Sequence, residues 1–335
     1  LDTDLSLALD LVSDVVLRGR CAAEDVEIER DVVLEEIAMR DDDPEDVLGE
    51  EFLTAMFGDH PVGRPVIGSV SSVSAMSRTQ LRSFHTRRYT PERMVVAVAG
   101  NIDHDEVVAL VRQYFGSRLD TSREPVAPRT GTGRIPGDPT LRLINRDSEQ
   151  THLLLGVRTP GRTWEHRWAT AVLNGALGGG LSSRLFQQIR ETRGLAYSVY
   201  SSVDSYCDTG TLSVYAGCLP ERFAEVVEVA TDVLASVAAD GITEAECRIA
   251  KGALRGALVL GLEDSASRMN RIGRNELNYG EHRSLESSLA NIEAVTLDEV
   301  NAVARTLLTR PFGAAVLGDY PSKKKLPKQL TRLLS

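Results

Sequence analysis

Two glutamates in the first half of the sequence, Glu29 and Glu36, are spaced so that one helix would carry both carboxylates on the same side. Seven residues make nearly two helical turns, so the side chains share a face and lie about 10 Å apart along the axis. Val33 lies between them on that face. A carboxylate beside apolar neighbours is costly unless it meets a cation, a metal ion or hydrogen-bond donors. The pair indicates either a metal site or an exposed acidic face whose carboxylates pair with Arg30 or Arg40.

A second polar group follows a run of three glycines, residues 178–180. Arg190 and Tyr197 could both reach a peptide carbonyl or a developing oxyanion, as cationic and phenolic donors do in acyl-transfer sites. Alternatively, Arg190 is a surface charge on a helix and Tyr197 packs within a strand. The glycines could also cradle a phosphate, but the sequence has no GxxxxGK[ST] motif and no GxGxxG motif after a strand. A nucleotide-binding module is therefore a weaker interpretation than a helix that begins close to another backbone segment.

The histidines do not supply a pair of metal ligands on one helix. No two of the six lie three to five residues apart. They are His60, His85, His104, His152, His166 and His282. His60 is predicted to be a turn or packing residue. The sequence also lacks the GxSxG motif that would indicate a serine hydrolase.

The composition is that of an acidic globular protein. The 335 residues suffice for two domains of ordinary size, and 42% of them are hydrophobic. The net charge of −10 argues against nucleic acid and anionic membranes as partners, since both demand a basic surface. No apolar stretch reaches the length of a membrane helix. The four cysteines form no CxxC pair, which favours reduced thiols and a cytoplasmic location.

A proline-rich stretch, residues 121–140, predicts a domain boundary. It contains four prolines and almost no large apolar residue, so it cannot bury enough surface to fold as a core. We therefore expect a first domain over residues 1–124, a linker over residues 125–140 and a second domain over residues 141–335.

The two predicted domains resemble each other. Capping boxes at Ser77–Gln80 and Thr296–Glu299 each open a helix, and each helix leads to an apolar strand that ends in glycine. The strands are predicted at Met94–Gly100 and Ala314–Gly318. Two further pairs of similar segments, one from each half of the sequence, are separated by nearly the same number of residues. This regular separation indicates a duplication. The alternative is a chance resemblance between amphipathic helices.

The duplication predicts what the first domain lacks. Glu29 and Glu36 correspond to Ala250 and Ala257 in the second half, so the repeat itself does not require the carboxylates. The second copy begins near Leu141 and has a front portion of roughly 80 residues without a counterpart in the first copy. We therefore expect the first domain to be truncated.

That front portion is predicted to combine strands with helices. It should contain a strand at Thr151–Val157, a helix at Trp164–Leu177 and strands at Ala196–Val203 and Gly210–Gly217. Alternation of polar and apolar residues in the last two indicates half-buried antiparallel strands. The predicted class is α+β, with two homologous domains that each have an antiparallel sheet with helices packed on one face.

Together these residues resemble the pitrilysin/insulinase family of zinc metallopeptidases, which includes mitochondrial processing peptidase and small bacterial zinc proteases. The resemblance extends over essentially the whole chain, and the small bacterial members are the most similar. The markers are Glu29-x6-Glu36, Phe57-Gly-Asp-His-Pro-Val-Gly63, Tyr89-x-Pro-x3-Val95-Val-Ala-Val-Ala-Gly-Asn101, Gly179-Gly-Leu-Ser-Ser-Arg-Leu-Phe186 and Arg190-x6-Tyr197.

The resemblance implies roles for four residues. Glu36 would be the third zinc ligand, and Glu29 would be a carboxylate that supports the ligands. Arg190 and Tyr197 would contact bound peptide, and Tyr197 would help to stabilise the tetrahedral oxyanion.

The family's H-x-x-E-H motif supplies the two histidine ligands and the general base, and this sequence does not contain it. We expect it upstream of Leu1, with Gly180–Arg184 as its counterpart in the duplication. Zn²⁺ is therefore expected in the complete protein, whereas this chain is expected to hold none at the catalytic site.

The resemblance implies a zinc-dependent metalloendopeptidase that hydrolyses short or unstructured peptides, in a form that is inactive without the missing segment. In the family, substrate binds as an added strand at a sheet edge. A homodimer is expected by analogy. The alternative is a non-catalytic structural subunit, like the family's core proteins in respiratory complexes. Retention of both Glu29 and Glu36 favours the peptidase.

Overall fold

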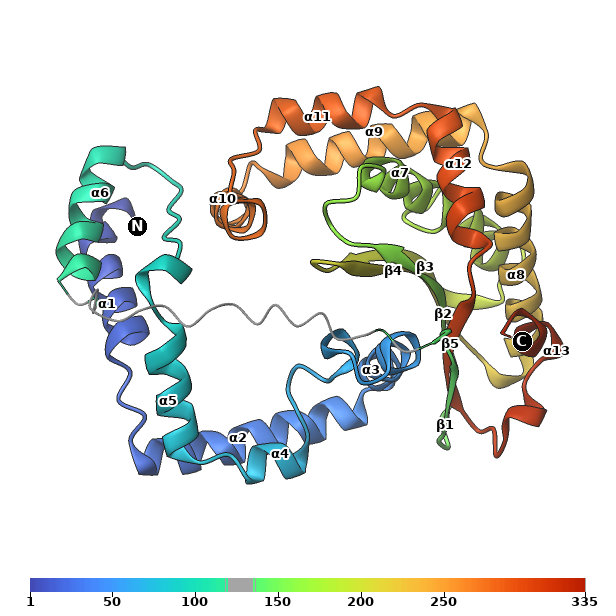
Figure 1. Ribbon diagram of the computed structural model, residues 1–335. Helices are drawn as coiled ribbons and strands as arrows, with labels where there is room; N and C mark the ends of the chain where they lie inside the picture. The colour runs from blue at the N-terminus through green and yellow to red at the C-terminus, as the bar shows by residue number, and fades with distance from the viewer. Residues whose placement is uncertain (118, 120–134, 136, 335) are drawn as a thin grey trace. The chain divides into compact units, whose positions relative to one another are not determined.

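A five-stranded sheet organises the second half of the chain (Figure 1). The computed structural model describes residues 1–117, 119, 135 and 137–334. The strands are β1 (Leu141–Asn145), β2 (Thr151–Pro160), β3 (Ala196–Ser205), β4 (Thr209–Cys218) and β5 (Phe312–Gly318). Their order is β1-β5-β2-β4-β3, in which β1 and β5 run parallel and the other neighbours run antiparallel. The sheet is therefore mixed, with β1 and β3 at its edges.

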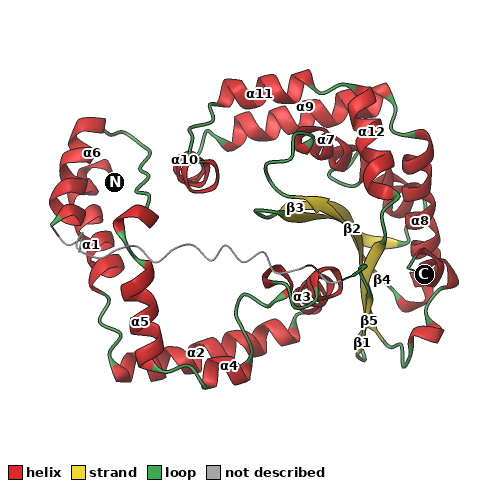
Figure 2. Cartoon of the chain, viewed as in Figure 1, coloured by secondary structure: helices red, strands yellow, loops and turns green. Residues whose placement is uncertain are grey.

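Helices account for most of the remaining described chain (Figure 2). In the first half they are α1 (Leu5–Arg18), α2 (Ala23–Asp42), α3 (Pro44–Phe57), α4 (Val70–Ser74), α5 (Arg78–Arg88) and α6 (His104–Val111). In the second half they are α7 (Arg167–Leu177), α8 (Phe223–Asp240), α9 (Glu244–Gly261), α10 (Ser265–Tyr279), α11 (Leu285–Ala294), α12 (Leu297–Leu308) and α13 (Lys328–Leu333). Among the described helices, none is long and apolar enough to cross a membrane.

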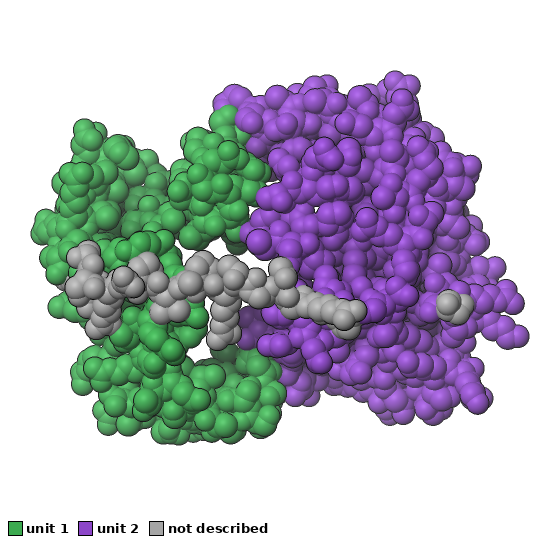
Figure 3. Space-filling view, in the orientation of Figure 1, with its two compact units in different colours: residues 1–38, 67–132, 259–284 green, residues 39–66, 133–258, 285–335 purple. Residues whose placement is uncertain are grey.

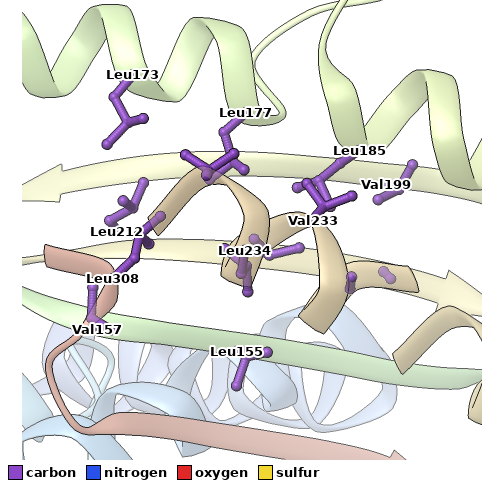
Figure 4. Close-up of a cluster of buried hydrophobic side chains, with 14 of the residues drawn as sticks. Leu155, Val157, Leu173, Leu177, Leu185, Val199, Leu212, Val233, Leu234 and Leu308 are labelled. Atoms are coloured by element: carbon purple, nitrogen blue, oxygen red, sulfur yellow. The ribbon is translucent and has the colours of Figure 1, made fainter. Parts of the chain in front are cut away.

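One face of the sheet packs against α7, α8 and α12 (Figure 1). Strand residues such as Leu155, Val157 and Leu212 point into this layer, where they meet side chains of the helices such as Leu173 and Val233 (Figure 4). Removing this apolar surface from water contributes about 25 cal/mol per Å² and is the main force that holds the layers together.

The other face of the sheet is covered by α3, which comes from the first half of the chain. Its apolar side chains form a second cluster with residues of β4 and β5: Leu48, Phe52, Met56, Phe57, Tyr215, Ala315 and Leu317. Every residue of β4 is consequently buried. The predicted α+β class is confirmed, but the half-buried pattern predicted for Gly210–Gly217 is wrong because helices cover both faces.

The helical part of the fold occurs twice. The series α1 to α5 and the series α8 to α12 follow the same order along the chain. Both predicted capping boxes form, since Ser77 and Thr296 accept hydrogen bonds from the backbone amide three residues later, at 3.3 and 3.2 Å. Helices α3 and α10 each begin at an aspartate cap and end at a glycine with positive φ, Gly58 at 54° and Gly280 at 66°. These matches support the duplication.

The described residues of the first half form no strand, although the sequence predicts one at Met94–Gly100. A strand is stabilised by hydrogen bonds to its neighbours in a sheet, and this segment has no such neighbour among the described residues. Its counterpart β5 pairs with both β1 and β2. The antiparallel sheet predicted for the first domain is therefore not formed by residues 1–117.

The chain divides into two compact units, which Figure 3 shows in different colours. Unit 1 comprises residues 1–38, 67–132 and 259–284, and unit 2 comprises residues 39–66, 133–258 and 285–335. Each half of the sequence thus contributes one helix to the unit formed mainly by the other half, α3 to unit 2 and α10 to unit 1. The division at a linker over residues 125–140 stays a prediction, and residues 125–134 and 136 lie outside the described residues.

Loss of the α3 contact should destabilise the protein. Phe52→Ala removes a buried ring from the second cluster and should lower the free energy of unfolding by about 3–5 kcal/mol. Phe84→Ala makes the same change at an exposed position and should cost less than about 1 kcal/mol. Urea denaturation followed by circular dichroism measures both. Equal losses in the two variants would show that α3 does not stabilise the sheet.

Candidate functional site

Helix α2 carries both glutamates that the spacing singles out. Acidic residues in its first turn and an arginine in its last turn complement the helix dipole. Val26 and Ile37 are buried on one side of the helix, whereas Glu29 and Glu36 are exposed on another. The two carboxylates therefore lie beside the packed side of the helix, about 10 Å apart along the axis.

Neither of these carboxylates is neutralised by the arginines nearest to it in the sequence. Arg30 pairs with Glu27, at 3.0 Å, and donates to the backbone carbonyl of Met76, just after α4, at 2.8 Å. Arg40 pairs with Glu50. Within the described part of the chain, Glu29 and Glu36 take part in no hydrogen bond or ion pair. The ion pairs expected for a simple acidic face are therefore not made.

Glu29 lines a cavity of about 460 Å³ within unit 1, between α2, α4 and α5. Most of its wall is apolar and includes Val33, Phe84 and Tyr89. His85 also lines it, but its Nε2 lies 2.7 Å from a backbone carbonyl oxygen and its ring stacks on Tyr89 at 4.5 Å. The carboxylate of Glu29 thus borders a largely apolar space.

The donor set around Glu36 is not that of a complete zinc site. Zinc in proteins takes four ligands, of which a catalytic site draws three from protein side chains. Among the described residues, no group of three or more His, Cys, Asp or Glu side chains could hold a metal ion. The residues present therefore do not fit zinc by themselves, and Glu36 offers at most one ligand.

A second cavity, of about 280 Å³, lies within unit 2 between α7, α9 and the glycine-rich loop. Its wall includes Ala250 and Ala257 from α9, together with Gly180 and Ser183 from the loop. Ala250 and Ala257 are the repeat counterparts of Glu29 and Glu36. Gly180 and Ser183 belong to the segment that is the predicted counterpart of the H-x-x-E-H motif. The structure therefore brings together the two segments that the duplication relates to a metal site.

The glycines of this loop allow two backbone segments to approach each other. The carbonyl oxygen of Gly178 accepts a hydrogen bond from the amide of Ser201 in β3, at 3.0 Å. A Cβ atom on Gly178 would lie 2.5 Å from that amide nitrogen, which is too close for any other residue. The interpretation of this glycine as a close-approach residue is confirmed.

Arg190 and Tyr197 lie together in unit 2. Arg190 is on the π-helical segment Phe186–Glu191, and its Nη1 donates to the carbonyl oxygen of Tyr197 at 2.9 Å. Its guanidinium also lies over the ring of Tyr197, 4.4 Å from the centroid. Tyr197 is 79% exposed and sits at an irregularity in the register of β3. The predicted pair is therefore adjacent, at an edge strand, with the phenol directed toward solvent.

His60 is a packing residue, as predicted. It is buried, and its Nδ1 accepts a hydrogen bond from the backbone amide of Val62 at 3.3 Å. Its ring lies 6.1 Å from that of Phe57, centroid to centroid. It therefore stabilises the turn after α3.

A polar network that joins buried His152 and Tyr215 to exposed Glu45 of α3 was not predicted from the sequence. The hydroxyl of Tyr215 donates to Glu45 at 2.9 Å and lies 2.8 Å from Nδ1 of His152. Burial raises the pKa of Tyr215 well above its usual value, and burial also lowers the pKa of His152. The three residues come from α3, β2 and β4, so no local pattern could have grouped them.

Comparison with known proteins gives consistent matches over almost the whole chain. Residues 75–254 match the family model described as "Peptidase M16 inactive domain". A protein of Mycobacterium tuberculosis named as an uncharacterized zinc protease is 72% identical over 334 residues, which are 100% of this chain and 76% of that protein. A Bacillus subtilis protein with the same kind of name is 36% identical, over 96% of this chain and 78% of that protein.

Solved structures share the fold. A protease from Helicobacter pylori matches with a TM-score of 0.87 and 21% identity, over 95% of this chain and 77% of that one. A chain of complex III from Candida albicans matches with a TM-score of 0.80 and 17% identity, over 99% of this chain and 81% of that one.

The His152 network should make stability depend on pH. Because the pKa of His152 is lower in the folded protein, the unfolded chain binds the proton first as the pH falls. Neutral His152 therefore contributes to the free energy of unfolding above the ordinary histidine pKa, and this contribution is lost as the pH falls below it. The free energy of unfolding should fall between about pH 7.5 and pH 5, and His152→Gln should reduce that fall. Exposed His104→Gln is the control, and an equal effect of both variants would contradict this assignment.

Proposed function

This chain belongs to the pitrilysin/insulinase (M16) family of peptidases, and we propose that the protein is a zinc-dependent metalloendopeptidase that hydrolyses peptides and unstructured polypeptide segments. In this proposal Glu36 is one metal ligand and Glu29 supports the site without binding the metal. The remaining protein ligands are the two histidines of an H-x-x-E-H motif, which these 335 residues do not contain. The polypeptide as it stands should therefore neither hold catalytic zinc nor hydrolyse peptides.

The observation that carries this proposal is the wall of the unit 2 cavity. Ala250 and Ala257, the repeat counterparts of the two α2 glutamates, line one space together with loop residues 180–183. That loop occupies the place in the repeat that the inverted zinc motif occupies in the family's first domain. In a first copy with the same geometry, the carboxylates of Glu29 and Glu36 would point toward the H-x-x-E-H motif.

The state of the two carboxylates also supports a ligand role. Glu29 and Glu36 remain unpaired in the described chain even though Arg30 and Arg40 lie within four residues of them in the sequence. A metal ligand must be available to the metal, and a carboxylate already held by a guanidinium is not. The second copy lacks carboxylates at both positions, so they serve the first copy alone.

Arg190 and Tyr197 would position the peptide. The guanidinium of Arg190 is held against the ring and the carbonyl of Tyr197, which fixes the direction of the tyrosine side chain. The exposed phenol can then donate a hydrogen bond to a peptide carbonyl or to an oxyanion that develops from it. β3 is an edge strand, so a peptide could also pair with its free backbone groups. We further propose a cytoplasmic homodimer, as the resemblance implies.

A non-catalytic structural subunit is the second candidate. It is favoured by the family model, which is described as an inactive domain, and by the likeness in fold to a chain of complex III. Such a subunit would have no use for two exposed glutamates on one face of α2, and this is why the peptidase is preferred.

The proposal predicts that Glu36→Gln abolishes zinc binding in a form of the protein that includes the histidine motif. Amidation keeps the size of the side chain but removes the charge that binds the metal. Bound zinc, measured by atomic emission, should fall from about one per chain to near zero, and hydrolysis of an unstructured fluorogenic peptide should fall at least about 100-fold.

Glu35→Gln is the matched control, because Glu35 is also exposed but lies about 100° farther round α2. It should keep both zinc and activity. Unchanged zinc and activity in Glu36→Gln would refute the ligand assignment. Absence of zinc and of activity in the unsubstituted protein would favour the structural subunit.

A further inference from the structure

An apolar stripe on α1 lies largely open in unit 1, whereas the equivalent stripe in unit 2 is covered. On α1 it follows the helical spacing i, i+3, i+7 and i+10 and comprises Leu5, Ala8, Val12 and Val15. Val12 is 52% exposed and Val15 is 74% exposed. At the separation that relates Gly100 to Gly318, the equivalent residues of α8 are Phe223, Val226, Ala230 and Val233. All four are buried, so the repeat places a covering layer on this stripe.

Two further elements of unit 1 show the same difference. Phe84 of α5 is 56% exposed, whereas its counterpart on α12, Val303, is buried. Val96 is 39% exposed, whereas its counterpart on β5, Ala314, is buried. In unit 2 the side chains of α8, α12 and β5 form one cluster with those of α7, β2 and β4, which residues 141–218 supply. The open positions of unit 1 therefore mark the place of an equivalent layer, a sheet with one helix.

The segment over residues 95–99 is placed like a strand that has no neighbours. Its backbone groups make no hydrogen bond within the part of the chain that the structure describes. A Cβ atom on Gly273 of α10 would lie 3.3 Å from Cβ of Ala97, and the counterpart of Ala97 is Ala315 in the cluster under α3. Helix α10 thus covers one side of this segment as α3 covers one side of β5. Unpaired backbone groups beside apolar side chains are costly, so the segment should pair with any strands that a partner supplies.

From these features we infer that α1, α5 and residues 94–99 form a docking face for a sheet with one helix, of the architecture that residues 141–218 have in unit 2. On docking, residues 94–99 become a strand of that sheet and pair as β5 pairs with β1 and β2. The apolar side chains of the sheet then cover α1 and α5.

The occupant of this docking face is the segment that carries the H-x-x-E-H motif, and only this identification rests on the proposed function. A second copy of the chain could not cover the face with its own sheet, because helices already pack on both sides of that sheet. The interface buries apolar surface and forms backbone hydrogen bonds, so it should hold the motif to this chain without a peptide bond.

Cleavage of a longer form tests the interface without relying on a metal ion. A protease site is placed between the motif segment and Leu1, the folded protein is cut, and size-exclusion chromatography in EDTA shows whether the two pieces stay together. They should elute together, and the amides of residues 95–99 should exchange with deuterium at least about 100-fold more slowly than in this chain alone. Absence of zinc and of activity in the uncut protein would contradict the proposed function and leave this result unaffected.

Two matched substitutions on α1 locate the interface. Val12→Glu places a charge on the docking face, so it should weaken the association of the cut pieces at least about 100-fold. Leu7→Glu is the control, because Leu7 is 57% exposed and its counterpart on α8, Glu225, is exposed as well. It should leave the dissociation constant within about twofold, and neither change should alter the far-ultraviolet circular dichroism of this chain alone. Separation of the unsubstituted pieces, exchange that the segment does not slow, or equal effects of the two variants would each overturn the inference.

Discussion

Burial of the second sheet face by α3 is the contact on which the rest of unit 2 depends. The helix comes from the first half of the chain, yet its apolar side excludes water from a sheet built by the second half. Polar contacts secure it, since Arg142 pairs with Glu51 at 2.6 Å and Arg146 donates to two backbone carbonyls in the last turn of α2. These contacts hold α3 and residues 41–42 against the sheet within unit 2.

The local features of the fold could be predicted from the sequence because their causes are local. Ser77 and Thr296 cap the helices that their spacing to Gln80 and Glu299 indicates, and the α+β class follows from alternating apolar periods. Non-local features could not be predicted in this way. The strand predicted at Met94–Gly100 lacks a neighbour with which to pair, and a pattern of residues does not show whether a partner is present.

The candidate site also has local features that the sequence predicts and non-local features that it does not. Spacing alone identified the shared face of Glu29 and Glu36, because two helical turns are a property of the backbone. It could not show that the neighbouring arginines bond elsewhere, since their partners are set by tertiary packing. The network of Glu45, His152 and Tyr215 joins three elements far apart in the chain.

In the proposed function, the carboxylate of Glu36 binds a zinc ion whose other protein ligands are the two histidines of the H-x-x-E-H motif. The most direct measurement is anomalous X-ray scattering at the zinc edge, on crystals of a form that includes the H-x-x-E-H motif. A zinc peak is expected about 2.0–2.2 Å from a carboxylate oxygen of Glu36, with Glu29 beyond bonding distance. A zinc peak that does not touch Glu36, or zinc-soaked crystals without a peak on α2, would contradict it.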